Sequence, residues 1–180
     1  MIETPRFSLW LLLPREAHAR FQAIIARLSA QLGTPAFEPH ITLLGGLSGA
    51  EEDLRQRTRV LACAIKPFEA RLLKVAWLDD YYRCLFVEVV PSRALHAAHE
   101  AAGRQFDRHL GTRFYPHLSL VYGELEKKEK EQILDNIGRS FDESACIDNL
   151  ALYDTSGPPS VWRCVERVGL GGGSRAARPG

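Results

Sequence analysis

Two short segments of the sequence carry a histidine that is followed two residues later by a hydroxyl side chain. The first reads FEPHITL and contains His40 and Thr42, and the second reads FYPHLSL and contains His117 and Ser119. Both fit one pattern, Phe-x-Pro-His-apolar-Ser/Thr-Leu. A single histidine followed two residues later by a hydroxyl residue can occur by chance. A second copy with the same flanking residues indicates a duplicated unit.

The apolar residues between and after these polar ones predict that both segments are β-strands. Alternate side chains of a strand point to opposite faces. His40 and Thr42 therefore share one face, while Ile41 and Leu43 share the other, and the second segment alternates in the same way. Two such strands facing each other present two imidazoles and two hydroxyls to a common space.

Two imidazoles in one cleft suit the opening of a cyclic phosphodiester by water. One neutral imidazole takes a proton from water, and a protonated imidazole supplies a proton to the departing sugar oxygen. Histidine suits both tasks because its ordinary pKa is about 6.5. Thr42 and Ser119 can donate hydrogen bonds to the phosphate oxygens. We expect no metal and no cofactor, but the pattern leaves open a metal-binding pair, a structural repeat, and which histidine is the base.

The elements around the two motifs repeat in one order: a strand, a helix, the motif strand and a second helix. We expect strands at 7–13, 40–44, 68–78, 84–90, 117–122, 147–153 and 161–168, and helices at 15–32, from Ser48 onward, at 92–110 and at 126–137. No Gly-rich phosphate loop follows any strand, which disfavours a doubly wound parallel sheet. We therefore expect an α+β fold with two pseudo-symmetric lobes around a central cleft, each lobe an antiparallel sheet with outer helices.

Length and composition set the class of protein. The chain has 180 residues, and we expect a single bilobal domain over 1–170 and a disordered tail over 171–180. Lys and Arg number 23 against 22 Asp and Glu, which disfavours a dedicated duplex-binding protein. The apolar run 9–13 is too short for a signal peptide or a membrane span. We expect a cytoplasmic monomer with no membrane partner.

At these residues the chain resembles the 2H phosphoesterase superfamily, which is defined by two H-x-[ST]-x motifs on facing strands. The resemblance covers most of residues 7–168 and implies a LigT-like fold. It is strongest to the plant and yeast cyclic nucleotide phosphodiesterases, through the short length, SLW at 8–10 and PHLSLVYG at 116–123.

That branch implies a place in RNA and tRNA splicing metabolism and two substrates, both small cyclic phosphate nucleotides. ADP-ribose 1″,2″-cyclic phosphate would give the 1″-phosphate, and nucleoside 2′,3′-cyclic phosphates would give 2′-phosphates. Enzymes that act on cyclic phosphates or 2′–5′ linkages at RNA ends share the same motifs, so an RNA end is an alternative substrate. A non-catalytic nucleotide-binding module is a third alternative.

Three aromatic residues gain a role from the same resemblance. It places Trp10 beside the cleft, where the ring could stack on a base, Tyr82 in the base pocket, and Tyr122 near the phosphate. Without the resemblance, Trp10 fits the core and Tyr82 fits a surface turn. Strict alternation puts Tyr122 on the face opposite His117, so the strand has to end or twist before Tyr122.

The cysteines and the remaining polar residues have simpler interpretations. The four cysteines form no CxxC pair, so we expect reduced thiols and no zinc site. The resemblance alone suggests a disulfide between Cys63 and Cys164, and spacing cannot test it. We expect a solvated helix face at 127–130 and four surface histidines, namely His18, His96, His99 and His109.

Overall fold

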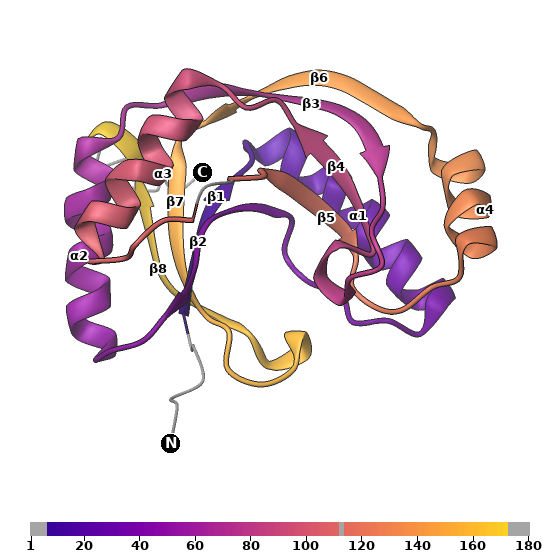
Figure 1. Cartoon of the computed structure of the whole chain (residues 1–180), viewed down its shortest axis with the longest axis horizontal. Coiled ribbons are helices and arrows are strands. Elements are labelled where there is room, and N and C mark those ends of the chain that lie inside the picture. Colours follow the sequence, from indigo (N-terminus) through magenta and orange to yellow (C-terminus); the bar gives the residue numbers. More distant parts are fainter. Residues whose placement is uncertain (1–6, 112–113, 173–180) are drawn as a thin grey trace, which may run out of the picture.

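An antiparallel sheet of eight strands, in the order β6-β3-β4-β5-β2-β1-β7-β8, dominates the computed structural model, which describes residues 7–111 and 114–172 (Figure 1). The strands are β1 Phe7–Leu12, β2 His40–Leu47, β3 Phe68–Ala76, β4 Leu85–Val89, β5 His117–Val121, β6 Ser140–Ile147, β7 Asn149–Asp154 and β8 Arg163–Gly169. The helices are α1 Arg15–Leu32, α2 Glu51–Ala64, α3 Arg93–Gln105 and α4 Lys127–Ile137.

The sheet consists of two four-stranded halves, which confirms the expected α+β fold. One half contains β1, β2, β7 and β8, and the other contains β3, β4, β5 and β6. The run β1-α1-β2 corresponds to β4-α3-β5, so the repeat in the sequence is a repeat in space. The halves meet where β2 pairs with β5, at Ile41 opposite Leu118. The two motif strands are therefore the central pair of one shared sheet.

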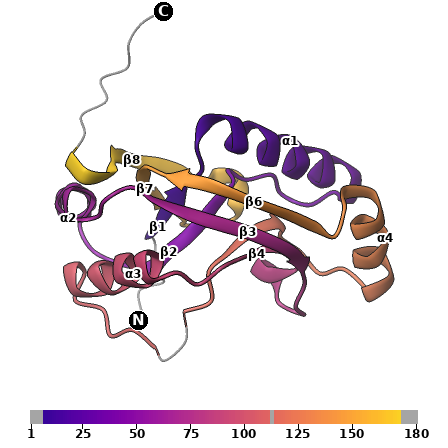
Figure 2. The ribbon, with the colours of Figure 1, turned by 90° about the horizontal axis from the view of Figure 1, so that it is seen from above.

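Helices α1 and α3 are exchanged between the two halves (Figure 2). Helix α1 follows β1 but packs against β5, and its Phe21 lies 4.9 Å from Phe141 of β6, measured between ring centroids. Helix α3 follows β4 but packs against β2, where the His99 Nδ1–H donates to the Leu43 carbonyl at 2.7 Å. His99 is also stacked on Phe114, so its assignment to the surface was wrong.

The two faces of the sheet divide the motif residues as alternation predicts. Ile41, Leu43, Leu118 and Leu120 are buried in the main core beneath the helices. On the opposite face lies a second, smaller apolar cluster. It consists of Trp10, Leu12, Ala151 and Tyr153, with Trp162 packed against it. Strands β1 and β7 thus bury side chains on both faces of the sheet, and β1 lies directly beside the motif strand β2.

The local signals that begin and end helices hold at some positions and fail at others. Gly33 ends α1 with a φ of 65°, and the Ser92 hydroxyl caps α3 by accepting from the Leu95 N–H. The expected start of α2 at Ser48 was wrong. Strand β2 continues to Leu47, so the helix begins only at Glu51, without a side-chain cap.

Other boundaries also differ from the expected ones. Helix α3 ends at Gln105 instead of 110. Strand β6 was missed because its sequence, SFDESACI, is polar, as suits a strand at the edge of a sheet. The expected strand 147–153 combines the last residue of β6, at 147, with most of β7. Lys130, expected in solvent, is 2% exposed and donates to the Leu78 carbonyl and the Asp79 carboxylate.

The C-terminal end and the helices bear on two further expectations. Gly171 and Gly172 belong to a short 3₁₀ helix, Leu170–Gly172, and the rest of the expected tail, 173–180, lies outside the described residues. None of the helices in the described ranges is long and apolar enough to cross a membrane.

Candidate active site

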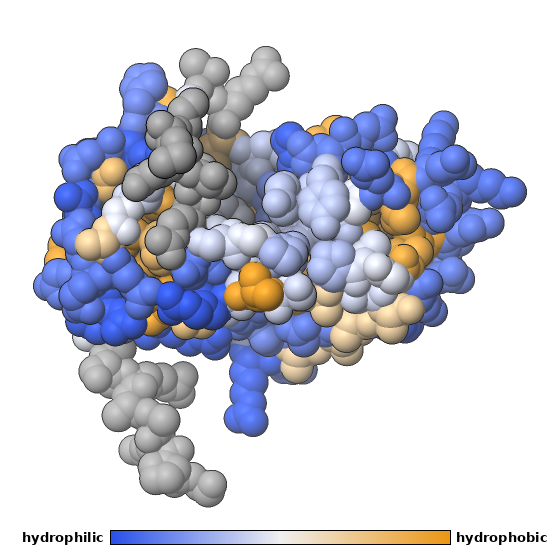
Figure 3. Space-filling model, turned by 90° about the horizontal axis from the view of Figure 1, so that it is seen from below, coloured by the Kyte–Doolittle hydropathy of each residue, from blue (hydrophilic) through white to orange (hydrophobic). Residues whose placement is uncertain are grey.

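A cleft of about 1330 Å³ opens on the sheet face opposite the helices. Residues from both halves of the sheet line its walls. Figure 3 shows the surface of the molecule from below. All seven residues that the sequence singled out line this cleft: Trp10, His40, Thr42, Tyr82, His117, Ser119 and Tyr122. The structure thus brings together residues that are up to 112 positions apart in the chain.

Each motif histidine is held by a carbonyl two residues before it. The His40 Nδ1–H donates to the Glu38 carbonyl at 2.7 Å, and the His117 Nδ1–H donates to the Tyr115 carbonyl at 2.9 Å. A carbonyl oxygen can only accept, so Nδ1 carries the proton in both neutral rings. Nε2 is therefore the nitrogen that can take up or release a proton in the cleft.

The central strand pairing places each imidazole opposite the other motif's hydroxyl. Strands β2 and β5 are antiparallel with Ile41 opposite Leu118. One position to either side, this register sets His40 across from Ser119 and Thr42 across from His117. The Ser119 hydroxyl donates to the Tyr82 carbonyl at 2.8 Å, which ties the short 3₁₀ helix Tyr81–Arg83 to the motif strand.

The environments of the two imidazoles differ. Trp10 stacks on His40 with ring centroids 3.5 Å apart and planes 3° apart, whereas Phe86 meets His117 with its ring tilted by 65° at 5.3 Å. Burial lowers the pKa of His40 to about 3, against a raising contribution from the Glu38 carbonyl. Burial also lowers the pKa of His117, and the nearby Arg83 adds to that effect. A single proton shared between the two rings therefore prefers His117.

Trp10 lines the cleft but is not placed to stack on a base. One face of its indole lies on His40, and Tyr153 is stacked with it at 3.7 Å. Its Nε1–H donates to the Ser8 hydroxyl, and the residue is 2% exposed. The expected stacking role is thus wrong, because neighbours already cover the ring; Trp10 instead packs behind His40.

Tyr82 and Trp162 supply an aromatic pair at the mouth of the cleft. Their ring centroids are 6.2 Å apart with planes 23° apart, which exceeds direct stacking distance. Tyr82 comes from one half of the sheet and Trp162 from the β7–β8 loop of the other. The Trp162 Nε1–H donates to the Gly157 carbonyl within that loop.

Tyr122 reaches the cleft because β5 ends at Val121, one residue before it. Alternation therefore no longer dictates its direction, as the expectation required. Its ring is stacked on Phe37 at 3.7 Å, and burial raises the pKa of its hydroxyl far above the usual value. Tyr122 is consequently a neutral hydrogen-bond donor beside Ser119.

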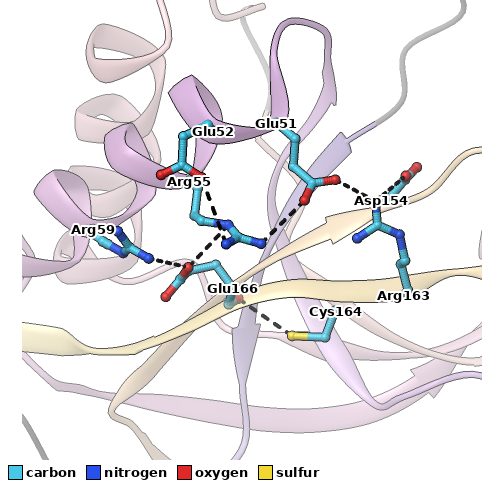
Figure 4. A network of polar contacts seen from close by, with 8 residues as sticks. All are labelled: Glu51, Glu52, Arg55, Arg59, Asp154, Arg163, Cys164 and Glu166. Atoms are coloured by element: carbon cyan, nitrogen blue, oxygen red, sulfur yellow. Dashed lines mark hydrogen bonds and ion pairs between the residues drawn. The ribbon is translucent and has the colours of Figure 1, made fainter.

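An ion-pair network fixes the base of the loop that carries Trp162 (Figure 4). Arg163, the next residue, donates to Asp154 at the end of β7 and to Glu51 at the start of α2. Further along the same helix, Arg55 and Arg59 both pair with Glu166 of β8. Helix α2 is therefore tied to the two strands between which the loop runs.

The same contacts argue against a disulfide between Cys63 and Cys164. All four cysteines are free thiols. Glu51 bonds Arg163, next to Cys164, whereas Cys63 lies twelve residues further along α2, about 18 Å at 1.5 Å per residue. A disulfide needs Cα atoms within about 7 Å. The disulfide that the resemblance suggested is therefore wrong.

Sequence reasoning missed several residues of the site, of which four matter for the argument: Asp80, Arg83, Phe86 and Trp162. None belongs to the repeated motif, and Trp162 is far from both motifs in the chain. Phe86 had a detectable signal, since it occupies the place in β4, opposite Ser119, that Trp10 occupies in β1, opposite Thr42. Within the ranges that the structure describes, no three His, Cys, Asp or Glu side chains are grouped to hold a metal.

Comparison with known proteins identifies a family and a relative of this chain. The family model of the 2′-5′ RNA ligase superfamily matches residues 11–159. The cyclic phosphodiesterase of Arabidopsis thaliana is 25% identical over 125 residues, which cover 69% of each chain.

Two solved structures have a similar fold. The protein TT0787 of Thermus thermophilus has a TM-score of 0.65 at 20% identity and covers 93% of this chain and 98% of its own. LigT of E. coli in complex with 3′-AMP has a TM-score of 0.60 at 21% identity, with 93% and 99% covered. The family match spans both histidine motifs and most of the sheet, and the chain therefore belongs to the 2′-5′ RNA ligase superfamily, the 2H phosphoesterases.

Proposed function

We propose that this phosphodiesterase hydrolyses small cyclic phosphodiesters by general acid and base catalysis through His40 and His117. The observation that carries the proposal is the matched pair of imidazoles in one cleft. Each holds its Nδ1–H on a backbone carbonyl and keeps Nε2 for proton transfer. The fixed tautomer means that no rearrangement is needed before reaction.

The different environments of the two rings favour one division of roles between them. His40 has the lower pKa, so it is neutral and acts as the base when His117 carries the proton. His40 Nε2 removes a proton from water, and the water oxygen forms a new bond to phosphorus. The bond from phosphorus to one ring oxygen breaks, and His117 Nε2 gives its proton to that leaving oxygen. Each transfer contributes roughly 10²–10⁴-fold to the rate.

Three hydroxyl groups hold the phosphate between the two imidazoles in this proposal. Thr42 and Ser119 lie on the same strand faces as the histidines. Thr42 donates to a non-bridging oxygen, Ser119 does the same when its hydroxyl turns from the Tyr82 carbonyl to the substrate, and Tyr122 adds a neutral phenol. Such donors stabilise the charge that grows on phosphorus in the transition state. They also keep the attacking water, phosphorus and leaving oxygen in line.

The aromatic pair at the mouth suits a nucleobase. The ring centroids of Tyr82 and Trp162 are 6.2 Å apart with planes 23° apart, so two nearly parallel aromatic rings are available for a planar base to stack on. Base stacking on such rings tolerates any base. Nucleotide ligands also occur in the fold, since LigT of E. coli was crystallised with 3′-AMP, with ATP and with NADP⁺.

The substrates that follow are nucleoside 2′,3′-cyclic phosphates, which would open to 2′-phosphates, and ADP-ribose 1″,2″-cyclic phosphate, which would open to the 1″-phosphate. The A. thaliana relative, named a cyclic phosphodiesterase, supports this class. Because the clamp fixes one line of attack, we expect a single regioisomer. Phosphorus NMR of the product tests this, and a mixture of 2′- and 3′-phosphates would contradict the clamp.

Replacement of the histidines tests the mechanism itself. His40→Ala and His117→Ala should each lower kcat by about 10²–10⁴-fold, because each removes one proton transfer. His109→Ala, at an exposed position outside the cleft, is the matched control and should keep full activity. Circular dichroism checks that the variants fold. Near-normal turnover in either folded variant would reject the two-histidine mechanism, as would loss of activity in EDTA that one divalent metal restores.

A further inference from the structure

The charges that line the cleft are few. Among the described residues that form its walls, Arg83 is the only lysine or arginine, and Asp80 is the only acidic residue. The other walls are aromatic rings, hydroxyl groups, glycines and the two histidines. Figure 3 shows residues of intermediate hydropathy across the middle of the face seen from below, with hydrophilic residues at its two ends.

Asp80 holds Arg83 through both carboxylate oxygens. One oxygen accepts from the backbone N–H groups of Tyr82 and Arg83, and the other accepts from the Arg83 Nη2 at 3.0 Å. These contacts make Asp80 the cap of the short helix Tyr81–Arg83. The Ser119 hydroxyl bonds the Tyr82 carbonyl of the same helix, so Arg83 stands on an element tied directly to the catalytic strand.

The guanidinium keeps donors for a ligand. Arginine has five N–H donors, and the side-chain bond to Asp80 engages one nitrogen. Arg83 is close enough to His117 for its charge to act on that ring. Arg83 and His117 line the same cleft, so Arg83 can bind the phosphate from which the leaving oxygen departs with the proton of His117.

We propose that Arg83, held in place by Asp80, binds the phosphate of the substrate and makes the cleft favour one phosphate charge. Of the two substrates proposed above, the cleft then prefers a nucleoside 2′,3′-cyclic phosphate to ADP-ribose 1″,2″-cyclic phosphate, whose diphosphate adds two further charges. The proposal rests on the hydrolytic function argued above. With the substrate bound, protonated His117 and Arg83 carry two positive charges, and Asp80 and the phosphodiester carry two negative charges. This balance is complete for a mononucleoside cyclic phosphate. Any further phosphate would meet no additional cation on the walls that the structure describes.

Two arginines outside the cleft walls are candidates to bind the further phosphates of a longer substrate. Arg163 is engaged by the carboxylates of Asp154 and Glu51. Arg108 donates to the carbonyl of Gly46, a residue that lines the cleft, and is exposed. An enzyme that binds an RNA backbone would use Arg108 for a second phosphate. A cleft that accepts one phosphate charge does not need this residue.

Steady-state kinetics of three variants test the role of Arg83. The substrate is a nucleoside 2′,3′-cyclic phosphate. Arg83→Gln should raise KM by about 10- to 100-fold, the range for losing a hydrogen bond to a charged group, while kcat changes less than about threefold. Arg83→Lys should recover part of the affinity. The matched control is Arg71→Gln, on β3 and paired with Asp142 outside the cleft, and its kinetics should equal those of the unaltered enzyme. An unchanged KM in Arg83→Gln would overturn the assignment.

Substrates of increasing length test the charge limit. We expect the mononucleotide and RNA di- and tetranucleotides that end in a 2′,3′-cyclic phosphate to have kcat/KM values within about threefold, with equal dependence on salt. An increase of more than about tenfold with length, steeper in salt and abolished by Arg108→Gln, would reject the limit and identify an RNA-end enzyme. Absence of turnover with every substrate would reject the hydrolytic function, and this proposal with it.

Discussion

At the scale of single residues, burial of the two imidazoles predicts where activity falls with pH. In the proposed mechanism, the reactive form has His40 neutral and His117 protonated. His40 loses its proton at a pKa of about 3, and His117 loses its proton below 6.5 because both rings are desolvated. Activity therefore rises through the first pKa and falls through the second. We expect kcat/KM to be greatest on the acid side of pH 6.5, lower than the range expected from free imidazole.

The measurement is kcat/KM at constant ionic strength between pH 4 and 9, with a nucleoside 2′,3′-cyclic phosphate. This range covers the falling limb, and because the two rings are coupled, the apparent pKa of that limb is a property of the pair. A bound phosphodiester places a negative charge beside both rings, so the falling limb of kcat should lie at higher pH than that of kcat/KM. A maximum of kcat/KM above pH 7 would contradict the burial argument.

At the scale of elements, the β7–β8 loop supplies an aromatic ring whose contribution can be separated from the chemistry. Trp162→Ala should raise KM for a nucleoside cyclic phosphate by about 10-fold, because base stacking contributes roughly 1–3 kcal/mol. Its kcat should stay within about threefold. Steady-state kinetics give both values.

Two controls isolate the ring from the loop. Val161→Ala alters the exposed neighbour of Trp162 and should leave KM unchanged. A cyclic phosphate that lacks a base, such as glycerol 1,2-cyclic phosphate, should be hydrolysed equally by Trp162→Ala and the unaltered enzyme. If Trp162→Ala lost activity on both substrates alike, the ring would be supporting the loop instead of the base.

At the scale of the whole molecule, the exchanged helices predict that the two halves unfold as one unit. Phe21 of α1 is fully buried against the half of the sheet that contains β5 and β6, whereas β1, the strand before α1, belongs to the other half. Phe21→Ala should cost about 3–5 kcal/mol in the free energy of unfolding and shift both halves together. Urea unfolding followed by tryptophan fluorescence and by far-UV circular dichroism should give one coincident transition. Two separate transitions would mean that the halves are independent domains.

Much of the site could be predicted from the sequence because it depends on short-range rules. The repeated motif located His40 and His117, and alternation along a strand assigned their hydroxyl partners to the same face. Helix α1 was predicted with both ends correct, since its apolar period and Gly33 are local signals. The start of α2 was not, because Ser48 is a good cap in isolation but β2 extends almost to it.

Only the tertiary structure decided what depends on distant neighbours. The rings of His40 and Tyr153 cover Trp10, so the base stacking that we propose uses Trp162, a residue that no motif marks. Burial lowers the pKa of both histidines, that of His40 to about 3, although the repeat makes the two residues look equivalent. A sequence repeat specifies which groups recur along the chain, whereas desolvation depends on the atoms that surround each group, and those come from the whole fold.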